Sequence, residues 1–77
     1  MIKKSVEEAI NKQINAEFYS GYMYLSMAAY FESINLSGFA NWMHVQALEE
    51  QDHGMKFYRY LEERGGRNRL LPIEEPP

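Results

Sequence analysis

The stretch VEEAINKQINAEFYSGYMYLSMAAYFE, residues 6–32, decides the fold because it contains no proline and repeats apolar residues at steps of three and four. Ser5 and Glu8 match a capping box just before it, so a helix is expected over about residues 6–33. Its inward face is predicted to hold Ile10, Ile14, Glu17, Gly21, Tyr24, Ala28 and Phe31. A carboxylate, Glu17, therefore stands in the middle of an otherwise apolar face.

A second helix is expected over about residues 38–64, after a turn of small polar residues in which Ser37 is a candidate cap. The pair Arg64-Gly65 is typical of a helix end, with a basic residue followed by a glycine in the left-handed conformation. The inward face of this helix is predicted to hold Phe39, Met43, Gln46, Glu50, His53, Phe57 and Tyr60.

The predicted fold is all-α, an antiparallel helical hairpin that forms a single domain over residues 1–77. All three prolines fall in the stretch from Pro72 to Pro77, so the tail over residues 67–77 is expected to be extended. A chain of 77 residues seldom buries enough apolar surface to fold alone, yet 45% of this one is hydrophobic. Self-association into a four-helix bundle is the simplest expectation.

Composition excludes several classes of function. The net charge is −3 without a sustained basic run, so nucleic acid is not an expected ligand. The chain has no cysteine, which excludes a disulfide framework, an iron–sulfur cluster and a thiol nucleophile. No stretch approaches the roughly 20 apolar residues that span a bilayer, and no signal peptide is recognisable. A soluble, cytoplasmic protein is expected.

Glu17, Glu50 and His53 are predicted to form a metal site. Glu50 and His53 are three residues apart, which places them on one helix face. Counted from the turn, Glu17 lies within roughly 5 Å of their level on the facing helix. Buried carboxylates here call for a paired base, a shared proton or a metal, and neither inward face carries a lysine or arginine before Arg64. Oxygen and imidazole ligands without sulfur suit iron, manganese or zinc.

The charge of such a site predicts a dimer. Two divalent irons carry four positive charges, whereas one chain offers only Glu17 and Glu50 as carboxylates in the predicted core. Two chains related by a twofold axis would supply four carboxylates and two copies of His53. A homodimer with a shared diiron centre is therefore expected.

Several motifs together resemble prokaryotic non-haem ferritins over nearly the whole chain. They are Glu17-Phe18-Tyr19-Ser20, Tyr22-Met23-Tyr24-Leu25-Ser26-Met27-Ala28, Gly38-Phe39-Ala40-Asn41-Trp42-Met43, Glu49-Glu50-Gln51-Asp52-His53-Gly54-Met55-Lys56 and Glu63-Arg64-Gly65-Gly66-Arg67. The resemblance implies an iron-storage protein with ferroxidase activity, whose subunits form a shell of 24 and oxidise Fe(II) with O2 or H2O2 at a diiron centre.

The resemblance also implies a role for individual residues. Glu17 would be a terminal ligand, Glu50 would bridge two irons, and His53 would bind one iron through a ring nitrogen. Tyr24 would be the tyrosine beside the centre, and Glu49 an acid near an accessory iron position. Gln51 stands where haem-binding bacterioferritins are expected to carry methionine, so no haem is expected.

The chain departs from the family in length. A family subunit is roughly twice as long, and the tail resembles only the beginning of the family's long crossover. Half of a four-helix bundle is therefore present, to be completed either by a second chain or by missing residues. The alternative function is a catalytically inactive helical module that dimerises or assembles without oxidising iron.

Overall fold

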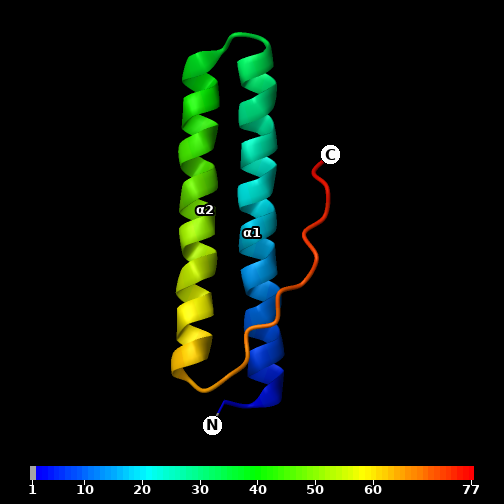
Figure 1. The fold of residues 1–77 in the computed structure, drawn as a ribbon, viewed down its shortest axis with the longest axis vertical. Helices are drawn as coiled ribbons and strands as arrows, with labels where there is room; N and C mark the ends of the chain where they lie inside the picture. The colour runs from blue at the N-terminus through cyan, green and yellow to red at the C-terminus, as the bar shows by residue number, and fades with distance from the viewer. Residues whose placement is uncertain (1) are drawn as a thin grey trace.

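The computed structural model describes residues 2–77, which form two long antiparallel helices joined by a short turn (Figure 1). Helix α1 spans Lys4–Ser33 and helix α2 spans Ser37–Glu63. The described part contains no strand, and its extents are 50 × 20 × 11 Å. The predicted all-α hairpin is confirmed. Met1 lies outside the described residues.

Both helices begin earlier than the sequence pattern predicts. Helix α1 starts at Lys4, and the carbonyl of Lys3 accepts hydrogen bonds from the N–H groups of Val6 and Glu7. No side chain caps this end, so the predicted capping box at Ser5 is wrong: Ser5 is already helical. Ser37 is likewise the first residue of α2 and not its cap.

The ends of the helices rely on two residues with positive φ. Asn35 has φ 61° in the turn, where the N–H of Leu36 donates to the carbonyl of Phe31. Gly65 has φ 75° after α2, and the N–H of Gly66 donates to the carbonyl of Leu61. A left-handed residue followed by such a bond satisfies carbonyls that the ending helix leaves free. The predicted glycine stop is confirmed.

The contact between the helices consists mainly of small side chains. The buried residues of α2 recur every seven positions, and those of α1 follow a similar spacing: Ala40, Ala47, Gly54 and Leu61 on α2, and Asn11, Ile14, Gly21 and Ala28 on α1. The predicted inward face of α2 is therefore wrong: the buried residues each lie one position after a residue that was predicted to face inward. Its larger residues stand beside the contact, with Phe39 60% and Tyr60 42% exposed, because small residues allow the closest approach of two helices.

Two glycines allow this close approach at the level of the predicted metal ligands. A Cβ atom at Gly21 would lie 3.2 Å from the carbonyl oxygen of Ala47 and 3.5 Å from the Cβ of Glu50. A Cβ atom at Gly54 would lie 2.5 Å from Cε1 of Phe18. The absence of a side chain at both positions therefore favours the close approach of the helices at this level. No helix of the described part is long and apolar enough to cross a membrane.

The tail after α2 has no regular secondary structure and runs back along α1 toward the turn (Figure 1). Polar side chains of α1 hold its backbone. The Asn11 amide donates to the carbonyl of Arg67 (3.0 Å) and accepts from the N–H of Arg69 (2.9 Å). Asn15 donates to the carbonyl of Pro72 (2.9 Å). The tail therefore obtains its hydrogen bonds without belonging to a sheet.

Candidate metal centre

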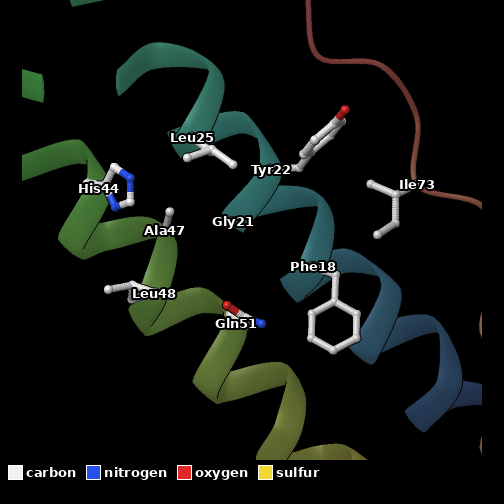
Figure 2. A pocket seen from close by; sticks show the side chains of 9 residues that line it. All are labelled: Phe18, Gly21, Tyr22, Leu25, His44, Ala47, Leu48, Gln51 and Ile73. Atoms are coloured by element: carbon white, nitrogen blue, oxygen red, sulfur yellow. The ribbon is translucent and has the colours of Figure 1, made fainter. Parts of the chain in front are cut away.

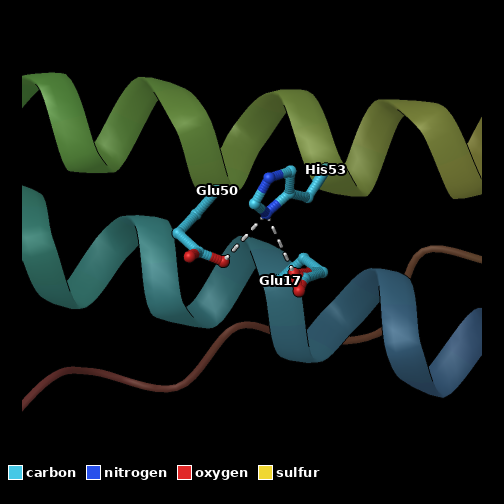
Figure 3. A group of neighbouring side chains, drawn as sticks. All are labelled: Glu17, Glu50 and His53. Carbon is cyan, nitrogen blue, oxygen red and sulfur yellow. Dashed lines mark ion pairs between the residues drawn. The ribbon is translucent and has the colours of Figure 1, made fainter.

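Glu17, Glu50 and His53 meet between the midpoints of the two helices (Figure 3). One possible ligand atom from each lies within 4.8 Å of the others. Nδ1 of His53 is 3.7 Å from Oε2 of Glu50 and 3.9 Å from Oε2 of Glu17. Glu50 and His53 are one turn apart on α2, and Glu17 faces them from α1, as their positions relative to the turn predict.

The three side chains lie at the edge of the helix contact and not inside it. The side chains of Glu17 and Glu50 are 17% and 22% exposed, whereas that of His53 is 49% exposed. The helical pattern predicts all three in the core, and this is wrong for the half-exposed His53. The small buried residues fill the line of contact, so the ligand side chains project beside it onto one open face of the hairpin.

Glu17 carries the strongest electrostatic signal of the site. Burial, followed by the negative charge of Glu50, raises the pKa of Glu17, while His53 and Gln13 lower it by less. Its Oε2 atom is buried without a hydrogen-bond partner among the described residues. A buried carboxylate oxygen that lacks a partner is costly, and a bound cation would supply the missing interaction.

The donor set agrees with a hard or borderline cation. Two carboxylates and one imidazole, without a thiolate, are the ligand types that suit iron, manganese or zinc. In the described residues, no lysine or arginine forms an ion pair with either carboxylate. The residues present therefore fit a divalent metal ion better than a structural ion pair.

The two weaker candidates lie outside this group. Tyr24 is on α1 two turns beyond Glu17 and is half-buried. Glu49 precedes Glu50 on α2, but its side chain is exposed and does not belong to the group of three. Gln13, which no sequence motif singles out, lies one turn before Glu17 on α1 and lowers the pKa of Glu17 through a side-chain hydrogen bond. The four-residue spacing to Glu17 was the available signal.

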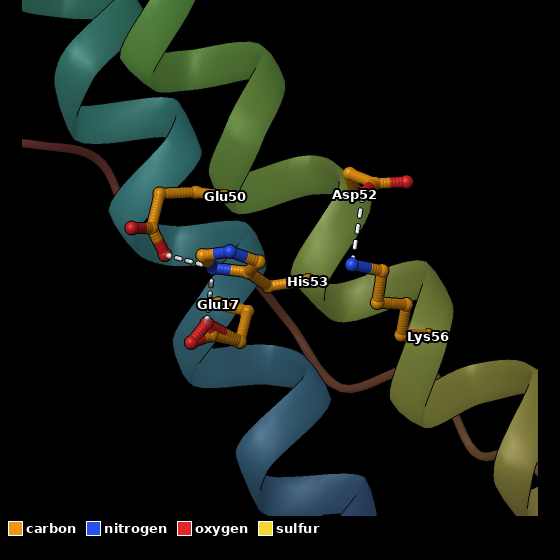
Figure 4. Close-up of polar contacts among 5 residues, drawn as sticks. All are labelled: Glu17, Glu50, Asp52, His53 and Lys56. Carbon is orange, nitrogen blue, oxygen red and sulfur yellow. Dashed lines mark ion pairs between the residues drawn. The ribbon is translucent and has the colours of Figure 1, made fainter.

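Two neighbouring features do not belong to the site. Lys56 pairs with Asp52 at 3.5 Å on the outer surface of α2, where both side chains are mostly exposed (Figure 4). An apolar groove of about 400 Å³ opens between the helices where Ile73 of the tail approaches (Figure 2). Its lining includes Phe18, Tyr22 and Leu48 but none of the three ligands. The metal candidates therefore stand apart from this groove.

Comparison with protein families gives one match, to a ferritin-like domain, over residues 7–77. Among curated proteins, the bacterial non-heme ferritin of Bacteroides fragilis is 43% identical over 77 residues, which is 100% of this chain and 48% of the relative. That of Staphylococcus aureus is 38% identical over 76 residues, or 99% of this chain and 46% of the relative. The chain spans about half the length of these relatives.

Comparison with solved structures also finds ferritins. An Archaeoglobus fulgidus ferritin engineered into a closed form is 57% identical, with a TM-score of 0.98 over 100% of this chain and 47% of that one. The open-pore ferritin of the same hyperthermophilic archaeon is also 57% identical, with a TM-score of 0.97 over 100% of this chain and 48% of the other. The hairpin thus matches these ferritins in sequence and in backbone shape.

Proposed function

We propose that this chain, which belongs to the ferritin-like family, takes part in iron storage by binding Fe(II) at Glu17, Glu50 and His53 and oxidising it. The observation that carries the proposal is the convergence of three possible ligand atoms within 4.8 Å, beside an Oε2 atom of Glu17 that has no hydrogen-bond partner in the described part of the chain. The ferritin relatives support the choice of iron over manganese or zinc.

Each ligand has a separate task in this proposal. Glu17, on α1, binds one side of the substrate ion, and Glu50, on α2, has a second carboxylate oxygen with which to bridge to another ion. His53 contributes a ring nitrogen and is the most exposed of the three, so it marks the side from which Fe(II) arrives. Hard carboxylate oxygens favour Fe(III) over Fe(II), which assists oxidation.

The proposed reaction is a ferroxidase reaction with a simple electron balance. Two Fe(II) ions each give up one electron, and one O2 takes both electrons and two protons to become H2O2. With H2O2 as oxidant, the same two electrons and two protons give two molecules of water. The Fe(III) product leaves for a ferric mineral, held in a shell of subunits such as the 24-subunit shell implied by the resemblance. No haem takes part in this reaction.

Oxidation of Fe(II) by the 77-residue protein tests the proposal. Fe(II) is mixed with the protein in air, and the appearance of Fe(III) is followed by its absorbance. The double variant Glu17→Ala/His53→Ala should reduce the protein-dependent rate at least tenfold and leave the helical circular dichroism unchanged. The matched control is Glu8→Ala/His44→Ala, which removes the same residue types from exposed positions of the same two helices.

The outcomes separate the proposal from its alternative. A rate that falls in the site variant but not in the control supports ferroxidase activity at this site. Equal rates in the wild type and the site variant refute it, because the iron would then react elsewhere on the surface. Metal binding without any oxidation would favour the alternative of an inactive assembly module.

A further inference from the structure

The tail after α2 is bound to α1 by a row of polar side chains. The row consists of three residues that stand four positions apart on one face of the helix: Glu7, Asn11 and Asn15. Glu7 accepts a hydrogen bond from the N–H of Arg67 at 2.7 Å. Asn11 accepts one from the N–H of Arg69 at 2.9 Å and donates one to the carbonyl of Arg67. The row therefore binds the backbone of the tail and not its side chains.

This attachment can open while the helices stay folded. The tail has no regular secondary structure, and Leu70 within it is 71% exposed. Segments whose backbone hydrogen bonds lie near the surface open at a smaller cost in free energy than a packed core. The tail is therefore expected to detach from α1 and return without unfolding of the hairpin.

Phe18 lies where the tail meets the helix pair. Phe18, Leu71 and Ile73 line one cavity of about 260 Å³ between the tail and α1. Phe18 and Ile73 also line the apolar groove between the helices (Figure 2). Detachment of the tail would open the cavity to water and remove the apolar wall beside Phe18.

The other contact of Phe18 crosses to α2 next to the metal candidates. A Cβ atom at Gly54 would lie 2.5 Å from Cε1 and 2.8 Å from Cδ1 of Phe18, so the ring lies directly against the backbone of α2. Phe18 follows Glu17 in the chain, just as Gly54 follows His53. A shift of Phe18 on this backbone would change the separation of Glu17 and His53, whose nearest polar side-chain atoms are 3.9 Å apart.

We infer that the tail and the metal site are coupled through Phe18, which acts as a positioning residue for Glu17. With the tail docked, Phe18 lies on Gly54 and holds Glu17 close to His53, as a shared ion requires. With the tail detached, Phe18 leaves Gly54 and the site binds metal more weakly. The inference rests on the proposed function, because it concerns the regulation of this same site.

Hydrogen exchange of the tail measures this coupling in one direction. The N–H groups of Arg67 and Arg69 lose their side-chain partners when the tail detaches, so their exchange rates report detachment. Saturating Zn(II), which has no redox chemistry, should slow both rates at least about fivefold, the lower end of common coupling factors. His53→Ala is the control for effects of Zn(II) outside the site and should show no slowing.

The affinity for Zn(II), measured by calorimetry, gives the coupling in the other direction. Asn11→Ala removes two hydrogen bonds to the tail, so it should lower the affinity in proportion to the docked fraction, about twofold when half of the molecules are detached. Because coupling is reciprocal, this loss should not exceed the factor by which Zn(II) slows exchange. Asn41→Ala removes the same side chain from an exposed position of α2 and should leave the affinity unchanged.

Variants of Phe18 test whether this residue transmits the coupling. In Phe18→Ala, saturating Zn(II) should no longer slow exchange at Arg67 and Arg69, and the further change Asn11→Ala should no longer alter the affinity for Zn(II). Phe18→Leu keeps an apolar side chain and should retain part of the slowing. Equal slowing in the wild type and in Phe18→Ala would overturn the inference, as would zinc binding to the wild type without slowing.

These results also distinguish the inference from the proposed function. Slowed exchange on zinc binding without iron oxidation would support the coupling and refute the ferroxidase proposal. Iron oxidation by a chain whose tail exchanges at the same rate with and without Zn(II) would support the ferroxidase proposal and refute the coupling. A wild-type chain that binds no Zn(II) would overturn both.

Discussion

Substitution of Gly54 by alanine should loosen the helix contact that brings Glu17, Glu50 and His53 together. The new Cβ would lie 2.5 Å from Cε1 and 2.8 Å from Cδ1 of Phe18, well inside van der Waals contact. Overpacking of this kind costs about 1–3 kcal/mol, while alanine in place of a helical glycine returns up to about 1 kcal/mol. The expected net loss is therefore about 0–2 kcal/mol.

Gly38→Ala is the matched control, because Gly38 is also helical and a Cβ there would meet nothing within 4 Å. Each variant gains helix propensity, so the difference between them measures mainly the contact with Phe18. That difference should be about 1–3 kcal/mol, which corresponds to a separation in Tm on the order of 10 °C for a chain of this size.

Thermal unfolding followed by circular dichroism measures both variants, and titration with Zn(II) measures the site. Gly54→Ala should bind Zn(II) more weakly than Gly38→Ala, because Phe18 directly follows Glu17 in α1 and must move. Phe18→Leu added to Gly54→Ala should recover part of the lost stability by making room. Equal Tm values for the two glycine variants would show that the close approach at Gly54 does not matter.

Three further changes have expected outcomes. Burial and the charge of Glu50 raise the pKa of Glu17 above the unfolded value of 4.5. The contribution of Glu17 to stability is therefore fully present below pH 4.5 and is lost as the pH rises through the folded pKa. Glu17→Gln should therefore melt higher than the wild type at pH 7 without metal but not at pH 3, and a lower Tm at pH 7 would contradict this. Asn11→Ala leaves the carbonyl of Arg67 and the N–H of Arg69 without partners and should cost about 1–3 kcal/mol of stability. Trypsin should then cleave faster at Arg67 and Arg69. The control Asn41→Ala, at an exposed position of α2, should leave the cleavage rate unchanged. Asp52→Asn breaks the exposed ion pair with Lys56, so it should change the free energy of unfolding by less than about 0.5 kcal/mol. The affinity for Zn(II) should stay unchanged. A larger effect on stability or on affinity would refute the assignment of this pair to the outer surface.

The hairpin and the convergence of Glu17, Glu50 and His53 could be predicted from the sequence because both follow from local periodicity. Steps of three and four residues set the helices, and counting from the turn placed Glu17 at the level of Glu50. The turn and the glycine at position 65 were also recognisable, since positive φ favours few residue types.

The sequence pattern failed where the result depends on contacts between distant residues. It assigned the large side chains of α2 to the contact, whereas Ala47 and Gly54 occupy it, because periodicity alone does not distinguish adjacent rows of one helix. It gave no sign that Asn11 and Asn15 bind the tail, since these bonds span more than 50 residues of sequence. The capping prediction at Ser5 failed because a motif match does not fix the first helical residue.

The asparagine contacts of α1 affect how freely the tail sequence can vary. Asn11 and Asn15 bind only carbonyl and N–H groups of the tail, which every residue other than proline offers in full. Outward-facing positions such as Arg67 and Arg69 can therefore exchange their side chains with little effect on docking. The side chains that hold the tail therefore belong to α1. Substitutions in the tail should be tolerated, whereas substitutions of Asn11 or Asn15 should weaken its attachment.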